Sequence, residues 1–100
     1  MPRQKLFKVR LERLIFVQGN LCAGCGKPML RAGERARTHA DMPTEDHVLP
    51  RTMYGVDRLG NLVAMHWACN NAKGDDRPTG CELIWLLAVN NRLGVEPMIW

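Results

Sequence analysis

The chain has 100 residues and a net charge of +4, and 46% of its residues are hydrophobic. This length predicts one domain, and the composition excludes a wholly disordered chain. No apolar run reaches the roughly 18 residues that a membrane span requires, and the first ten residues, MPRQKLFKVR, hold no signal-peptide stretch. We therefore expect a cytoplasmic protein that contacts no membrane. A domain this small usually needs disulfides, a metal or a partner to be stable.

The N-terminal part of the chain is rich in basic residues. Five of the fourteen Lys and Arg residues fall within the first thirteen positions, and we expect residues 1–8 to form a flexible basic arm. Such an arm suits a polyanion and favours nucleic acid as a partner over the alternative, that the charge only confers solubility. After the arm, apolar residues at helical spacing predict a helix over Val9–Gln18, which Gly19 and Asn20 end.

The middle of the chain predicts a hairpin followed by a short helix. A short strand is expected over Lys27–Leu30, and the polar stretch up to Glu45 is expected to be irregular or weakly extended. Strands are then expected over Asp46–Leu49 and Asn61–His66, joined by a loop that bends at its glycines. A helix should run from Trp67, taken as a core residue, to about Lys73.

A second helix is predicted near the C-terminus, over residues 79–93. Thr79 and Glu82 have the spacing of a capping box, and Gly94 is a helix stop. This helix is apolar nearly all round, so it is either largely buried or docks on a partner. Trp100, if exposed, is a candidate contact for such a partner.

Two ligand pairs predict a structural zinc site. Cys22-x-x-Cys25 and His66-x-x-Cys69 each place two ligands on one tight turn, and four ligands with no open position are typical of structural zinc. A redox-active Cys22/Cys25 pair and an unliganded turn are the alternatives. Cys81 could replace His66 as the fourth ligand, but its position beyond a helix break favours a small buried apolar residue.

The sequence around this zinc pattern resembles the HNH endonuclease family. The resemblance covers about residues 19–76 and rests on Asp46-His47-Val-Leu-Pro50, then Asn61-Leu62, then Cys69-Asn70-x-x-Lys73-Gly74. It implies an α+β fold: a small ββα-metal, treble-clef-like domain with structural zinc, formed by residues 1–100 as a single unit, with an N-terminal and a C-terminal helix. Standalone chains of this length are common in phage genomes, so the resemblance permits a bacterial or phage-infected cell as the setting, and we expect one.

The resemblance assigns roles to four polar residues. His47 would be the general base, a role that suits an imidazole at physiological pH. Asp46 and Asn70 would hold a catalytic Mg²⁺ or Mn²⁺, and Asn61 would brace the loop that orients His47. Asparagine at position 70 departs from the histidine in the family's name, but it is common in the Cys-Asn-x-x-Lys branch. Neighbours on a regular strand point to opposite faces, so joint use of Asp46 and His47 would require a bulge or a twist.

These features lead to two hypotheses about function. The first is a metal-dependent endonuclease that hydrolyses DNA with weak sequence preference; Arg51, Arg58 and Lys73 are the bases nearest the centre and would contact phosphates, unless they are simply solvated charges. One base per chain would cut one strand, so a duplex break would need two chains, as in a homodimer, or two encounters. The alternative is a non-catalytic, zinc-stabilised DNA-binding or docking module of a phage-type DNA-processing or packaging complex.

Overall fold

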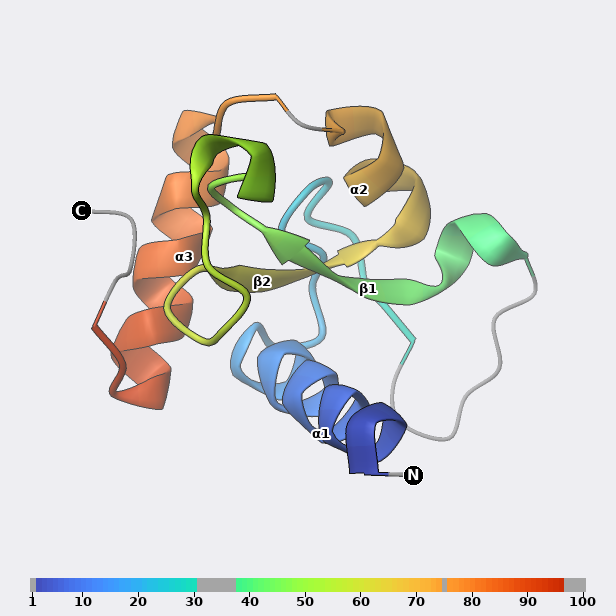
Figure 1. Cartoon of the computed structure of the whole chain (residues 1–100). Helices are drawn as coiled ribbons and strands as arrows, with labels where there is room; N and C mark the ends of the chain where they lie inside the picture. Colours follow the sequence, from blue (N-terminus) through green and yellow to red (C-terminus); the bar gives the residue numbers. More distant parts are fainter. Residues whose placement is uncertain (1, 31–37, 75, 97–100) are drawn as a thin grey trace.

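The computed structural model describes residues 2–30, 38–74 and 76–96. Figure 1 shows two strands in the middle of the molecule, with helices on either side. The elements in chain order are α1 (Pro2–Val17), the 3-10 helix η1 (His39–Asp41), β1 (Pro43–His47), the 3-10 helix η2 (Arg51–Met53), β2 (Leu62–His66), α2 (Trp67–Lys73) and α3 (Gly80–Leu93).

The strands β1 and β2 form an antiparallel pair. This pairing places the segment that holds Asp46 and His47 beside the segment that leads to the predicted zinc ligand His66. Asp46 lies opposite Val63, and His47 lies opposite Leu62. The first four residues of β2 are buried, so this strand forms the centre of the molecule. The helix α2 begins directly where β2 ends (Figure 1). This strand–strand–helix order confirms the predicted α+β fold.

The apolar core lies between the hairpin and the two long helices. Leu14 and Ile15 come from α1, and Leu86 and Val89 come from α3. The fully buried Gln18, just after α1, bonds the backbone of β2: its side-chain amide nitrogen donates to the carbonyl of Ala64, and its oxygen accepts from the amide of Ala64. The carbonyl of Ala64 also accepts a hydrogen bond from the backbone amide of Ala23, so Gln18 and Ala23 together pair the edge of β2 that does not face β1.

The N-terminal basic segment differs from its prediction. Instead of a flexible arm over residues 1–8, the helix α1 begins at Pro2 and continues to Val17. Proline is compatible with the first turn of a helix, and the lysine, arginine, leucine and glutamine residues that follow are good helix formers. The helix ends at Val17, one residue before the predicted end, and Gly19 follows with a φ of 65°.

Strand boundaries also shifted from their predicted positions. The strand β1 runs over Pro43–His47 instead of Asp46–Leu49, so part of the segment expected to be irregular is extended. The predicted strand at Lys27–Leu30 is reduced to one bridge between Leu21 and Pro28. Pro28 has no amide hydrogen, which prevents a regular ladder there.

The helix α3 confirms the predicted start and divides into two faces. Thr79 and Glu82 form a complete capping box, and Gly94 ends the helix in the left-handed conformation. Leu86 is fully buried, whereas Ile84 is 68% exposed and Leu87 is 47% exposed. The helix therefore packs one face on the core and presents a partly apolar face to solvent; Trp100 lies outside the described residues.

Trp67 is 36% exposed and is therefore not a core residue as predicted. Its ring lies 4.4 Å from that of His39 in an edge-to-face arrangement. In the described part of the chain, none of the helices has the length and apolar character needed to cross a bilayer.

Candidate active site and zinc centre

Four side chains meet at one point where the loop after α1 contacts the junction of β2 and α2. The sulfur atoms of Cys22, Cys25 and Cys69 and a ring nitrogen of His66 all lie within 4.8 Å of one another. Tetrahedral zinc with ligands at about 2.0–2.3 Å requires ligand atoms at roughly this mutual spacing. The residues therefore fit the predicted structural zinc ion, with three sulfur ligands and one nitrogen ligand.

The surroundings of this cluster orient its ligands. His66 Nδ1 lies 3.4 Å from Cys25 Sγ, and His66 Nε2 lies 3.1 Å from the carbonyl oxygen of Pro28. Because a carbonyl only accepts, Nε2 carries the hydrogen, which leaves the Nδ1 lone pair for the metal. Gly24 is required in the turn, since a Cβ atom at this position would lie 2.8 Å from Cys69 Cβ.

The protonation behaviour of the thiols also favours a cation. Burial raises the pKa of Cys25, but hydrogen bonds from the Lys27 backbone and from neighbouring side chains lower it to about 7. Burial and the neighbouring Cys22 raise the pKa of Cys69 to about 12. Cys25 therefore ionises readily, whereas burial and the neighbouring Cys22 hold Cys69 neutral. A bound divalent ion would stabilise the thiolate form of both residues.

Cys81 does not belong to this cluster. It lies on α3, is a free thiol and is exposed, so it is neither the fourth zinc ligand nor the buried apolar residue that we predicted. The start of α3 places it on the solvent side of the capping box, whereas Leu86 and Val89 lie on the buried side.

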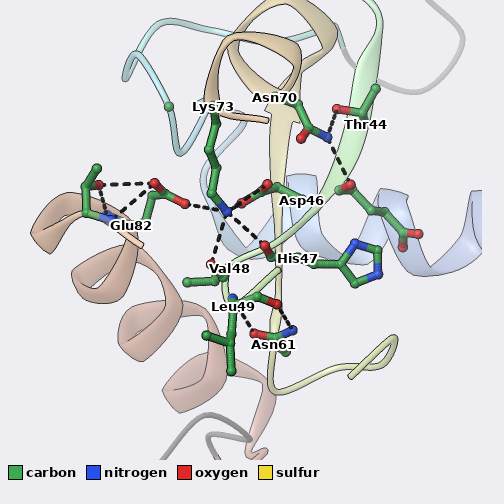
Figure 2. Close-up of polar contacts among 12 residues, drawn as sticks. Thr44, Asp46, His47, Val48, Leu49, Asn61, Asn70, Lys73 and Glu82 are labelled. Carbon is green, nitrogen blue, oxygen red and sulfur yellow. Dashed lines mark hydrogen bonds and ion pairs between the residues drawn. The ribbon is translucent and has the colours of Figure 1, made fainter. Parts of the chain in front are cut away.

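His47 stands at the end of β1 with its imidazole partly open to solvent. Its side chain is 26% exposed, and its Nε2 lies 3.1 Å from Oδ1 of Asp57 in the loop between the strands. In Figure 2 the ring points away from the cluster formed by Asp46 and Lys73. The position gives a solvent-accessible imidazole on a rigid strand, which is what a general base needs.

Asp46 points to the opposite side of the strand, as the alternation of side chains predicts. Both of its carboxylate oxygens accept hydrogen bonds from Lys73 Nζ, at 3.1 and 3.0 Å, and the side chain is 3% exposed. The same ammonium donates to the carbonyls of His47 and Val48 and lies 2.9 Å from Oε2 of Glu82 (Figure 2). Lys73 thus joins α2 to β1 and α3 through a buried ion cluster.

This cluster has two carboxylates and one ammonium. Burial raises the pKa of Asp46 and the nearby charge of Glu82 raises it further, while Lys73 lowers it; the result is about 6. Burial therefore outweighs the ion pair at this carboxyl, as desolvation often does for partly enclosed charges.

Asn70 lies on α2 and faces the same side of β1 as Asp46. Its amide nitrogen donates to the hydroxyl of Thr44 and to the carbonyl of Glu45, both at 3.1 Å (Figure 2). The two predicted ligands of a catalytic Mg²⁺ or Mn²⁺ are thus brought to one face. They do not present an open oxygen site, because the ammonium of Lys73 takes the place beside Asp46 that a cation would need.

Asn61 is fully buried, and its side chain binds the backbone at both ends of the loop that follows β1. Its side chain accepts from the amide of Leu49 and donates to the carbonyls of Leu49 and Val56, at 2.9 to 3.0 Å. Gly55 is also fixed by close contact, since a Cβ atom there would lie 1.7 Å from the carbonyl oxygen of Leu49. The loop that carries Asp57 is therefore tied to the end of β1.

The three predicted phosphate-binding bases are in different environments. Arg51 and Arg58 are exposed in the connection between β1 and β2, where they are accessible to a polyanion. The Lys73 side chain is 7% exposed and its ammonium is fully engaged, so it is not available to a phosphate. The Asn-x-x-Lys pattern correctly predicted that Lys73 lies close to Asp46 and His47, but its ammonium binds buried oxygen atoms of the protein and does not face the solvent.

Sequence reasoning missed Asp57 and Arg10, and it recognised Glu82 only as a helix cap. Arg10 on α1 donates to both carboxylate oxygens of Glu45, at 2.6 and 2.7 Å, and to Asp57 at 3.1 Å. No spacing rule connects α1 to the loop or α3 to Lys73, because these contacts join segments far apart in the sequence. The only available signal for Glu82 was its place in the capping box.

A comparison with protein families finds a match to the HNH endonuclease model over residues 22–76, more than half of the chain. The chain belongs to the HNH endonuclease family. The match begins at the first cysteine of the zinc cluster and ends just after α2, so it includes the hairpin and every predicted site residue of this HNH protein. The helices α1 and α3 lie outside it. Neither a curated protein nor a solved structure matches the chain.

Proposed function

We propose that this HNH protein is an endonuclease that hydrolyses DNA phosphodiester bonds with weak sequence preference. The observation that supports the proposal is the partly exposed imidazole of His47, which contacts Asp57 at the end of the hairpin strand and to which the family resemblance assigns the role of general base. A residue needed only for folding would gain nothing from this partly exposed position.

In this proposal His47 takes a proton from water, and the water oxygen forms a bond to phosphorus. The bond from phosphorus to the 3′ oxygen then breaks, which leaves a 5′-phosphate and a 3′-hydroxyl after the leaving oxygen is protonated by solvent. Arg51 and Arg58 hold the backbone by charge and supply no base readout, so binding should weaken steeply with salt.

Dependence on Mg²⁺ or Mn²⁺ is a separate part of the proposal. Asp46 and Asn70 lie on one face of β1, but a divalent ion could bind Asp46 only after Lys73 had moved away. We therefore derive no step through this ion. Digestion of DNA by the zinc-loaded protein, with and without added Mg²⁺ or Mn²⁺, measures whether the requirement exists.

The test of catalysis is digestion of supercoiled and linear DNA by the wild type and by His47→Ala. We expect loss of about 10²- to 10⁴-fold in rate in the variant, the contribution typical of a positioned general base. Zinc content and the unfolding midpoint serve as controls, because the His47 side chain is partly exposed and is a member of neither the apolar core nor the zinc cluster. Equal cutting by both proteins would remove His47 from the mechanism and with it this proposal.

A second candidate function is a non-catalytic, zinc-stabilised DNA-binding or docking module of a phage-type DNA-processing complex. The observation that favours it is the ion pair of Lys73 with Asp46, which blocks a predicted metal ligand. The partly apolar outer face of α3, with Ile84 and Leu87, would then be the surface for a partner or a second copy. Salt-sensitive DNA binding without cleavage under any divalent ion would favour this function.

A further inference from the structure

We propose that Asp57 is a positioning residue for His47, and that Arg10, on a helix outside the family match, holds Asp57 in place. The inference rests on the proposed nuclease function and assigns a further part of the same site. Its basis is a chain of contacts on the side of β1 away from Lys73, running from α1 through the loop to the imidazole.

The chain of contacts begins on β1. Glu45 and His47 are two residues apart, so their side chains lie on the same face of the strand. The guanidinium of Arg10 binds both oxygens of Glu45 and also reaches Oδ1 of Asp57 at 3.1 Å. The same Oδ1 atom lies 3.1 Å from Nε2 of His47. One carboxylate oxygen therefore joins a permanent cation to the imidazole.

The loop backbone restricts the position of Asp57 from its other side. The preceding residue, Val56, accepts a hydrogen bond from the buried amide of Asn61, which also bonds both backbone groups of Leu49. Asn61 thus fixes the loop, and Arg10 fixes the side chain that the loop carries. Neither contact would be needed if Asp57 were only a solvated surface charge.

The carboxylate determines which ring nitrogen of His47 is available for chemistry. Partial burial raises the pKa of Asp57, but the hydrogen bond from His47 and the charge of Arg10 lower it below its ordinary value. An ionised carboxylate only accepts hydrogen bonds, so Nε2 of His47 carries the hydrogen of the neutral ring. Nδ1 is then the lone-pair nitrogen and the atom that receives the proton from water.

This arrangement also stabilises the protonated ring after proton transfer. When Nδ1 receives the proton, the imidazolium lies against a negative oxygen, while Arg10 and Glu45 compensate each other and add no net charge. The reaction remains a hydrolysis as described above, since Asp57 neither gains nor loses a proton. Its part is orientation and charge, comparable to the orienting group of other base-assisted sites.

A spectroscopic measurement tests the geometry without reference to cleavage. The ring ¹⁵N resonances of His47, assigned by their loss in His47→Gln, report which nitrogen carries the hydrogen. In the wild type we expect a single Nε2–H tautomer; in Asp57→Ala we expect a mixture of tautomers. The exposed Asp76 provides a matched control, because Asp76→Ala removes the same charge elsewhere and should leave the His47 resonances unchanged.

The kinetics of DNA cleavage then test whether Asp57 contributes to catalysis. Asp57→Ala should lower kcat by about 10- to 100-fold, the range found when the hydrogen-bond partner of a metal-ligating histidine is removed, with KM changed less than about 3-fold. Asp57→Asn should lose less, because its amide oxygen still accepts from Nε2. Asp76→Ala should keep the wild-type kcat.

The outcomes separate this inference from the proposed function. A mixed tautomer already present in the wild type, or an unchanged kcat in Asp57→Ala, would overturn the role of Asp57. A lower KM with unchanged kcat would also overturn it, since this is the effect of removing a repulsive surface charge from a DNA-binding face. If wild-type His47 shows the single tautomer but the protein cuts no DNA, the nuclease proposal fails while the contact itself stands.

Discussion

At the scale of single residues, Lys73 has a role that its charge did not predict. Its ammonium donates to both oxygens of Asp46 and to the carbonyls of His47 and Val48, and it pairs with Glu82. An exposed lysine could bind phosphate, but this one satisfies a set of buried acceptors. It fixes the backbone of β1 at the residue that carries the imidazole.

Replacing Lys73 with methionine should therefore destabilise the protein strongly. The change leaves two buried carboxylates facing each other without a cation, which costs about 3–5 kcal/mol in similar clusters. Urea unfolding of zinc-loaded protein measures the effect. The exposed Lys27 is the matched control, and Lys27→Met should change the unfolding free energy by less than about 0.5 kcal/mol. Similar unfolding free energies for the two variants would contradict the buried cluster.

The raised pKa of Asp46 makes a prediction about pH. Because the folded-state value is about 6 against an ordinary 3.8, the folded protein binds this proton more tightly than the unfolded chain. The protonated Asp46 therefore stabilises the folded protein; this contribution is complete below about pH 4 and is lost as the pH rises through 6. The unfolding free energy of the wild type should fall over this range relative to that of Asp46→Asn.

Loss of bound zinc at low pH should affect both proteins equally, so the difference between them isolates Asp46. Lys73 and Glu82 are the charged groups that face this carboxyl. If the unfolding free energy of the wild type instead rises with pH relative to that of Asp46→Asn, Lys73 stabilises the carboxylate by more than burial destabilises it.

At the scale of elements, the loop between β1 and β2 depends on one buried side chain. Asn61 makes three hydrogen bonds to the backbone of Leu49 and Val56. In Asn61→Ala these backbone groups lose their partner, and we expect a loss of about 3 kcal/mol in unfolding free energy. Cleavage should slow as well, because the loop carries Asp57.

Thermal and urea unfolding measure the first effect, and single-turnover digestion measures the second. Asn71, on the exposed side of α2, is the matched control, and Asn71→Ala should leave both quantities near their wild-type values. Wild-type behaviour of Asn61→Ala in both assays would show that the loop is held in some other way.

At the scale of the whole molecule, the zinc cluster joins two segments that the sequence separates widely. Cys22 and Cys25 follow α1, whereas His66 and Cys69 stand where β2 passes into α2. In a domain of this size such a cross-link contributes folding energy that a small core cannot supply. Loss of the metal should therefore affect every element and not only the turn around it.

We expect about one tightly bound zinc ion per chain, and chelation should unfold the domain. Elemental analysis and far-UV circular dichroism measure the two effects. Cys69→Ser should lose zinc, whereas Cys81→Ser should retain it, because Cys81 lies outside the cluster. A folded, zinc-free wild type would refute the site.

The sequence by itself determined the features that depend on local spacing. The paired ligands Cys22-x-x-Cys25 and His66-x-x-Cys69, the order of two strands and a helix, and the capping box at Thr79 follow from residues a few positions apart. Such patterns act within one turn, helix or strand, so they can be recognised from the sequence alone. The roles expected of His47 and Asn61 came from the family resemblance and remain predictions; the structure shows that Asn61 binds the backbone of Leu49.

Only the tertiary structure decided which charges point inward and which segments meet. It turned Lys73 away from the solvent, exposed Cys81, and brought Arg10 of α1 to Asp57. These outcomes depend on how helices far apart in the sequence pack on the hairpin, and on whether a buried charge finds a partner there. The free energy of burying or pairing a charge depends on all its neighbours in space, and residue spacing along the chain does not contain that information.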